Sequence, residues 1–282
     1  MNGAKIADMS RRQVRLVLST FLVAACLCWQ ADSSPAQSQQ SDHQTGAQSA
    51  ADRRPVVIEL FTSEGCSSCP PADIFLKKLD TDQPIQGAQI IVLSEHVTYW
   101  DQEGWQDPNG SAALTERQSS YETALGEKDP FTPQIVVDGD REVTVQSFSH
   151  FGEVLRQARD EAKIPVQISD LSIDTDAPVL RAHIDTGENV TGHNAEVFLA
   201  VALSHVESQV LRGENGGRHL VHVAVVQKLT RIGKLSKGKS FADNVQLKLA
   251  SSDDPTNLRV VAFVQEPGPG KILGAALRKP GS

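Results

Sequence analysis

The chain has 282 residues, of which 39% are hydrophobic, and a formal net charge of −8 at pH 7. An acidic chain is a poor electrostatic match for nucleic acid or anionic lipid. The sequence also contains no P-loop and no Gly-x-Gly-x-x-Gly motif. Composition and motifs therefore argue against a nucleic-acid-binding or nucleotide-binding protein, and we expect no nucleic-acid partner.

The N-terminus predicts export. A basic patch around Arg12 precedes the apolar stretch "LVLSTFLVAACLCW", residues 16–29. This stretch is shorter than the roughly 20 residues that span a bilayer, so we predict a signal peptide over residues 1–29. The segment "VAAC" resembles the lipobox of bacterial lipoproteins, which would place cleavage before Cys26 and make Cys26 a lipid anchor. Cleavage after "SPA", residues 34–36, would instead release a soluble product. We expect a bacterial periplasmic protein or a membrane-anchored lipoprotein.

The rest of the chain divides into a linker and two domains. Residues 30–54 contain no apolar side chain larger than Ala or Pro, which predicts a disordered linker because too little surface can be buried. Residues 55–164 alternate strand-like and helix-like segments, whereas residues 165–282 are nearly all strand-like. The predicted boundary between the two domains therefore lies near residue 165.

The first domain is predicted to be α/β. Gly126 is placed to end its second helix, and Asp138-Gly139 predicts a hairpin turn. The resulting order βαβαββα is that of the thioredoxin fold, in which helices cover both faces of a central sheet. The segments are strands at 55–61 and 88–96, helices at 70–79, 111–126 and 148–162, and a hairpin at 134–147.

Two cysteines, Cys66 and Cys69, stand at the junction of the first strand and first helix, where this fold carries its CxxC motif. A thiolate there is stabilised by free backbone N–H groups and by the helix dipole. We expect Cys66 to be the more exposed nucleophile and Cys69 to be the buried resolving thiol, the two forming a disulfide. Their spacing makes a stapled secreted scaffold a weak interpretation.

A second mark of the fold is Thr132-Pro133, directly before the third predicted strand. In thioredoxin-like proteins a cis-proline at this position faces the CxxC and offers backbone groups to an extended substrate. We predict that Pro133 is cis and that Thr132 and Pro133 belong to the site. The alternative is an ordinary proline at the edge of a strand.

Glu59 lies in the first strand, seven residues before Cys66. We predict that it accepts the proton of Cys69, although the spacing is one residue longer than in thioredoxins. The alternative is a sheet residue paired with a lysine or with solvent.

The loop "HVTYWDQEGWQDP", residues 96–108, is rich in aromatic and acidic residues. Loops at the carboxyl ends of parallel strands bind ligands in α/β sheets, so we expect this loop beside the CxxC. Its members would form a substrate wall or modulate the thiols, or would simply cap the disulfide. The candidates are His96, Tyr99, Trp100, Asp101 and Trp105.

Five motifs resemble an uncharacterised bacterial family of secreted thioredoxin-like proteins, a domain of unknown function. They are "ELFTSEGCSSCPPAD", "HVTYWDQEGWQDP", "TERQSSY", "TPQIVVDG" and "RGENGGRHLVHVAVV". The resemblance covers about residues 55–280 and implies a thioredoxin-like domain and export, but no established reaction. Thr98 and Phe131 depart from the expected acid and tyrosine, which puts direct roles for these two in doubt.

The second domain, residues 165–282, has six or seven short runs of alternating apolar and polar residues, which predicts a β-sandwich. "RGENGGRH", residues 212–219, is a Gly-rich connection. His219 and His222 are three apart and do not share a strand face, so we expect no metal site there. We expect this domain to position the first domain or a partner and to carry no chemistry.

Three functions follow from the sequence. The first is an exported thiol–disulfide oxidoreductase acting on protein thiols and disulfides in the periplasm, with Cys66 attacking, Cys69 resolving and no cofactor. The second is a thioredoxin-fold binding module with a structural disulfide. The third is a copper-handling protein using Cys66, Cys69 and a nearby His such as His96, because soft thiolates suit Cu(I).

Overall fold

The computed structural model describes residues 53–127, 129–143, 148–174, 176–250 and 254–281. These residues belong to one compact unit. The predicted signal segment with Cys26 and the linker up to residue 52 lie outside the described residues and stay predictions. No helix in the described ranges is long and apolar enough to cross a membrane.

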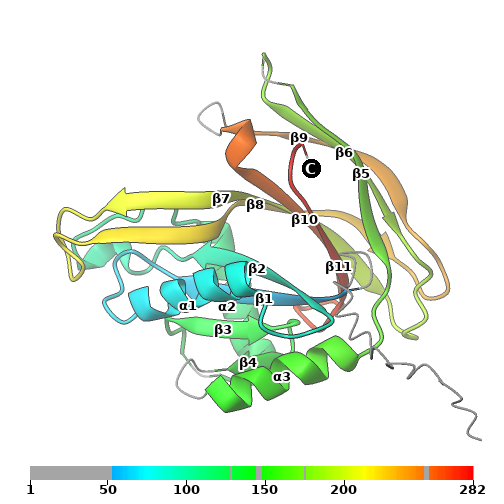
Figure 1. The fold of residues 1–282 in the computed structure, drawn as a ribbon, viewed down its shortest axis with the longest axis horizontal. Coiled ribbons are helices and arrows are strands. Elements are labelled where there is room, and N and C mark those ends of the chain that lie inside the picture. The colour runs from blue at the N-terminus through cyan, green and yellow to red at the C-terminus, as the bar shows by residue number, and fades with distance from the viewer. Residues whose placement is uncertain (1–52, 128, 144–147, 175, 251–253, 282) are drawn as a thin grey trace, which may run out of the picture. The chain divides into compact units, whose positions relative to one another are not determined.

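The first half of the described chain alternates strands and helices (Figure 1), and the predicted order βαβαββα is confirmed. A 3₁₀ turn, η2 (Asp101–Glu103), interrupts the loop after the second strand. The main elements are β1 (Arg54–Thr62), α1 (Pro70–Asp82), β2 (Ala88–His96), α2 (Ala112–Leu125), β3 (Gln134–Val137), β4 (Arg141–Val143) and α3 (Phe148–Asp160).

The ends of the helices follow local chemistry. Cys69 is the N-cap of α1, and Pro70 and Pro71 occupy the first helical positions, where a missing N–H costs little. Gly126 ends α2 with a φ of 82°, a left-handed conformation that glycine adopts without steric cost. The predicted stop at Gly126 is therefore confirmed.

The second half is built of strands, with a 3₁₀ turn η3 (Pro255–Asn257) before β10. Four of these strands continue the sheet of the first half, in the order β11-β10-β7-β8-β2-β1-β3-β4. A smaller sheet has the order β5-β6-β9. The strands are β5 (Val166–Asp174), β6 (Val179–Thr186), β7 (Ala195–Gln209), β8 (His219–Leu235), β9 (Ala242–Lys248), β10 (Leu258–Gln265) and β11 (Ile272–Arg278).

The smaller sheet packs against β7, β10 and β11 through an apolar core that includes Leu180, Val197 and Val260. The prediction of a mixed α/β protein with a β-rich second half is confirmed. The sequence analysis did not predict that one sheet runs through both halves. The division into two domains near residue 165 stays a prediction.

The two faces of the large sheet differ around β1. Ile58 and Leu60 pack with α1 and α3 on one face, whereas Val57 and Phe61 lie in separate apolar clusters on the other. Because side chains alternate along a strand, Glu59 shares the face of Val57 and Phe61, where α2 lies. This alternation decides which polar groups meet the cysteines.

A buried charge network joins α2 to β1 on that second face. Arg117 Nε donates to Glu59 Oε1 at 2.7 Å, and Tyr121 Oη donates to Glu59 Oε2 at 2.5 Å. Gln265 of β10 accepts from Arg117 Nη2 at 3.1 Å. Burial disfavours the charge on Arg117, but Glu59, together with Tyr121 and Glu95, outweighs this effect and raises the pKa of Arg117.

Glu95 of β2 lies beside this network, with its Oε2 atom 3.5 Å from Arg117 Nε. Neither carboxyl oxygen of Glu95 has a hydrogen-bond partner in the described part of the chain. Burial, and then the Glu59 carboxylate, raise the pKa of Glu95 well above its ordinary value, although Arg117 opposes the shift. Glu95 is therefore favoured as a neutral acid.

We predict that Arg117→Met lowers the free energy of unfolding by about 3–5 kcal/mol, because it leaves the Glu59 carboxylate buried and unpaired. Urea denaturation followed by circular dichroism measures the loss. Arg156→Met, which removes an exposed ion pair with Glu153, is the matched control and should cost far less. Equal losses in the two variants would contradict the structural role of Arg117.

Candidate functional site

Cys66 and Cys69 form a disulfide, with their Cα atoms 5.5 Å apart, in the turn between β1 and α1. The backbone N–H of Cys69 donates to the carbonyl of Cys66, and the carbonyl of Cys69 accepts from the first turn of α1. The predicted pairing and its place at the helix N-terminus are therefore confirmed.

The expected exposure of Cys66 is wrong, because both cysteines have 0% exposed surface. Ser67 and Ser68 between them are exposed. Trp100 packs against the turn on one side, where a β-carbon added at Gly65 would lie 3.0 Å from the Cβ atom of Trp100. The glycine thus permits the close approach that helps to cover the disulfide.

The tip of the β7–β8 hairpin closes over the same turn from another direction. Asn215 is fully buried, and its Nδ2 atom donates to the carbonyls of Glu64 and Cys66 at 2.8 and 2.9 Å. The Glu214 carboxylate accepts from the N–H of Ser67 at 3.2 Å. The "RGENGGRH" segment, interpreted from sequence as a simple connection, therefore covers the CxxC.

Thr132 and Pro133 lie beside the disulfide, and the predicted cis peptide bond between them is confirmed. The carbonyl oxygen of Thr132 is 3.8 Å from Cys66 Sγ and 3.3 Å from Ser68 Oγ. Trp100 Nε1 donates to Thr132 Oγ1 at 2.7 Å. The structure thus brings Thr132 and Trp100 to the CxxC, as the sequence predicts.

Other residues of the aromatic loop contact one another and the CxxC turn. Tyr99 packs beside Trp100, with ring centroids 6.2 Å apart. Asp101 Oδ1 accepts from the backbone N–H of Asp107 at 3.1 Å. Trp105 Nε1 donates to Glu64 Oε2 at 2.8 Å, which links the loop to the residue two before Cys66.

His96 is buried at the end of β2, and its Nδ1 atom is 2.7 Å from Asp107 Oδ2. Burial lowers the pKa of His96, but Asp107, helped by Asp73 and Glu64, outweighs this effect and the pKa is raised. The pKa of Asp107 is lowered, because the attraction of His96 and several hydrogen bonds outweigh its burial. The two form a buried ion pair.

Three buried polar residues near the disulfide were missed as candidates: Glu64, Asp73 and His222. His222 Nδ1 is 3.5 Å from Asp73 Oδ1, and His222 Nε2 is 3.8 Å from Glu64 Oε1. The rings of His222 and His96 meet edge to face at 4.8 Å. His222, from the second half of the chain, thus lies in this cluster, and the expectation that the second half carries no chemistry stays a prediction.

Within the described ranges, Asp73 Oδ2, His96 Nε2 and both ring nitrogens of His222 have no hydrogen-bond partner. Buried polar atoms are satisfied in most proteins, so this set beside the disulfide is a candidate functional region. The helical spacing of Cys69 and Asp73, four residues apart, was a signal in the sequence. His222 offered no comparable local signal.

The structure does not bring Glu59 to the cysteines. Its carboxylate lies on the face of the sheet that α2 covers and is bonded to Arg117 and Tyr121. Cys69 is the N-cap of α1, which packs on the opposite face. Asp73, on α1 itself and bonded to Thr62 at 3.1 Å, is the acid on the face of Cys69.

Comparison with known proteins identifies the family. Residues 57–265 match the family described as "Protein of unknown function (DUF1223)". The chain belongs to this family. No curated protein sequence matches the chain.

Two solved structures are similar to this DUF1223 protein. A crystal structure of a protein from Agrobacterium tumefaciens is 26% identical with a TM-score of 0.59, covering 79% of this chain and 92% of the other. HBP35 of Porphyromonas gingivalis is 15% identical with a TM-score of 0.61, covering 80% and 75% respectively. The second likeness concerns the fold alone.

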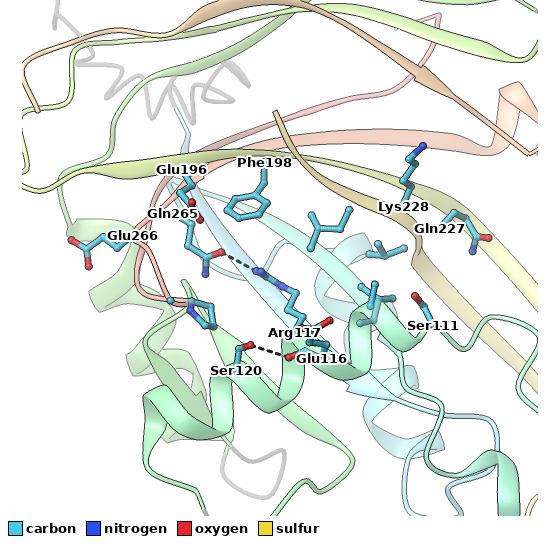
Figure 2. Close-up of a pocket in the computed structure, with 16 residues that line it drawn as sticks. Ser111, Glu116, Arg117, Ser120, Glu196, Phe198, Gln227, Lys228, Gln265 and Glu266 are labelled. Atoms are coloured by element: carbon cyan, nitrogen blue, oxygen red, sulfur yellow. Dashed lines mark hydrogen bonds between the residues drawn. The ribbon is translucent and has the colours of Figure 1, made fainter. Parts of the chain in front are cut away.

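A pocket of about 440 Å³ lies on the α2 face of the sheet. Figure 2 shows Arg117 reaching from α2 towards Gln265, with Phe198 beside it. Arg117 is already bonded to Glu59, Tyr121 and Gln265, so its role at the pocket is structural. Among the described residues, no group of three or more His, Cys, Asp or Glu side chains is arranged to hold a metal ion.

We predict that Asn215→Ala makes the disulfide easier to reach. Losing both hydrogen bonds to the CxxC turn lets the hairpin tip separate more often. Reduction by dithiothreitol, followed by thiol alkylation, should accelerate about tenfold, the factor that roughly 1.4 kcal/mol produces. Asn194→Ala, at the exposed position before β7, is the control. An unchanged rate for Asn215→Ala would contradict the cover.

We predict that Asp107→Asn changes the pH dependence of stability. The raised pKa of His96 contributes stability that is lost as pH rises through it, and the lowered pKa of Asp107 contributes stability that is lost as pH falls through it. Replacing Asp107 should therefore lower the free energy of unfolding most between about pH 4 and 6.5, and less above about pH 6.5. Urea unfolding at a series of pH values measures it, with Glu207→Gln at the exposed pair with His205 as control. A loss independent of pH would refute the ion pair.

Proposed function

We propose that this DUF1223 protein is a thiol–disulfide oxidoreductase that acts on protein disulfides through Cys66 and Cys69. The observation that carries the proposal is the position of the disulfide at the N-terminus of α1, with Cys66 Sγ 3.8 Å from the Thr132 carbonyl. A short disulfide ring at a helix start suits repeated opening and closing. The carbonyl of Thr132 is an acceptor for the backbone of an extended substrate.

We further propose that residues 55–164 form a thioredoxin-like domain. β1 and β2 are parallel, β3 pairs antiparallel with β1 and with β4, and α1 and α3 cover one face of this sheet. This arrangement supports the assignment made from the element order. The exported location, with the protein periplasmic or anchored through Cys26, is part of the same proposal.

In the reducing direction, the Cys66 thiolate attacks one sulfur of a substrate disulfide and forms a mixed disulfide. The displaced substrate sulfur leaves as a thiolate and takes up a proton. The Cys69 thiolate then attacks Cys66 Sγ, closes the Cys66–Cys69 disulfide and releases the second substrate thiol. Two electrons pass from the protein to the substrate, and the oxidising direction is the reverse.

The surroundings favour the reducing direction. Pro70 and Pro71 remove two N–H groups that would otherwise face a thiolate at the helix start. Glu64, Asp73 and Glu214 place carboxylates around the turn. Negative charge and few donors disfavour a thiolate, so they favour the disulfide state of the pair. A more stable disulfide has a lower reduction potential, so the reduced Cys66–Cys69 pair is a stronger reductant.

One observation favours a second function, a binding module with a structural disulfide. Both cysteines are fully buried, and Asn215 ties the CxxC turn to the hairpin. Exchange therefore requires the hairpin tip or Trp100 to move, whereas a structural disulfide does not.

We expect a reduction potential nearer about −270 mV than about −120 mV, the two limits between which exchange catalysts of the thioredoxin fold lie. The potential is measured in a glutathione redox series on the chain from residue 30 onward. A value below about −300 mV would mark a structural disulfide and favour the binding module. The Cys69→Ala variant should accumulate mixed disulfides with protein substrates. The Cys66→Ala variant is its matched control and should accumulate far fewer.

A further inference from the structure

A groove of about 560 Å³ runs between α1 and the first residues of β8. It begins at Pro70, the residue directly after Cys69, and continues past Ile74 to Thr81. The eleven helical steps from Pro70 to Thr81 rise about 16 Å, which equals the length of about five residues of extended chain. The groove therefore starts at the residue next to the buried disulfide and has the length of a short peptide.

The groove is lined by apolar side chains and by two buried polar ones. Ile74 is 57% exposed in the described structure, and Leu220 and Val221 line the opposite side. His222 and Asp73 are buried and line the same groove. As described above, His222 Nδ1 and Nε2 and Asp73 Oδ2 have no hydrogen-bond partner among the described residues. These atoms are closed off from solvent, and the His222 ring nitrogens face the carboxylates of Asp73 and Glu64, so the groove offers a ligand its apolar walls and its charged rim.

Two positive charges lie on the rim. Lys77 and Lys78 are exposed on α1 and take part in no ion pair within the described ranges, in a chain whose net charge is −8. His219, on the other rim, is 3.2 Å from Glu207, and Asp82 lies at the far end. The stretch of rim around Lys77 and Lys78, beyond the carboxylates that surround the CxxC turn, is thus open to a ligand that carries negative charge.

We infer that this groove binds an extended, acidic segment of the protein whose cysteine reacts with Cys66 or Cys69. The inference rests on the proposed function and names its substrate class. The helical rise from Pro70 places Ile74 about 6 Å, and Lys77 and Lys78 about 11 to 12 Å, along the groove. The segment therefore carries an apolar residue about two positions, and acidic residues about three and four positions, from its reactive cysteine.

Binding is tested without redox chemistry. The probe is a fluorescent ten-residue peptide with serine in place of the reactive cysteine, leucine two positions away, and glutamates three and four positions away. A matched peptide has lysines in place of the glutamates, and both are made in either chain direction. Fluorescence anisotropy with the oxidised protein should show at least tenfold tighter binding of the acidic peptide, weakening as salt is added.

Variants of the protein locate the site. The double variant Lys77→Glu/Lys78→Glu should weaken binding of the acidic peptide about tenfold, and Ile74→Ser about fivefold. Lys237→Glu, at an exposed position outside the groove, is the control and should leave affinity unchanged. Equal binding of acidic and basic peptides, no binding of either, or no effect of the double variant would overturn the inference.

The same peptides with cysteine restored, presented as a mixed disulfide, separate this inference from the proposed function. If the reduced protein exchanges with these peptides at rates that depend neither on peptide charge nor on Lys77 and Lys78, the proposed oxidoreductase activity is supported and the groove is rejected as its binding site. If binding depends on peptide charge but no thiol–disulfide exchange occurs, the groove is supported as a peptide-binding site and the oxidoreductase activity is rejected.

Discussion

The pairing of β8 with β2 is the constraint on which the rest of the site depends. Ser94 of β2 lies opposite Val225 of β8, so the sheet of the first half continues into strands of the second. Because β8 is there, its hairpin with β7 reaches back over the CxxC turn, and His222 lies against His96. The groove beside α1 has β8 as its second wall. The cover, the polar cluster and the groove therefore share one origin.

Two buried polar networks lie on opposite faces of the sheet and differ in the hydrogen bonding of their central residue. On the α2 face, Arg117 is bonded to Glu59, Tyr121 and Gln265, an arrangement that offsets the cost of burying its charge. On the α1 face, His222 lies near two carboxylates without a hydrogen bond in the part of the chain described. Glu95 beside Arg117 is also without a hydrogen bond among the described residues, so the contrast concerns the charged centre of each network: Arg117 is fully bonded, whereas His222 is left without a hydrogen-bond partner within them.

The cover over the disulfide and the groove beside it are parts of the same hairpin. Asn215, at its tip, holds the CxxC turn, whereas His219 and His222, at the start of β8, line the groove. A segment that fills the groove therefore touches the strand directly behind the cover. Binding that displaces the tip would couple substrate recognition to access, provided that the segment prefers the open hairpin.

The sequence by itself determined the local features: the CxxC at a strand–helix junction, the cis bond before Pro133, the helix stop at Gly126 and the family of the chain. Each depends on residues close together in the chain. The tertiary structure alone decided that Cys66 is buried, that Glu59 faces Arg117 and that Asp73 meets His222. Those outcomes depend on which strands pair and on which face each side chain lies. Such long-range pairing is set by the packing of the whole core and leaves no short pattern in the sequence.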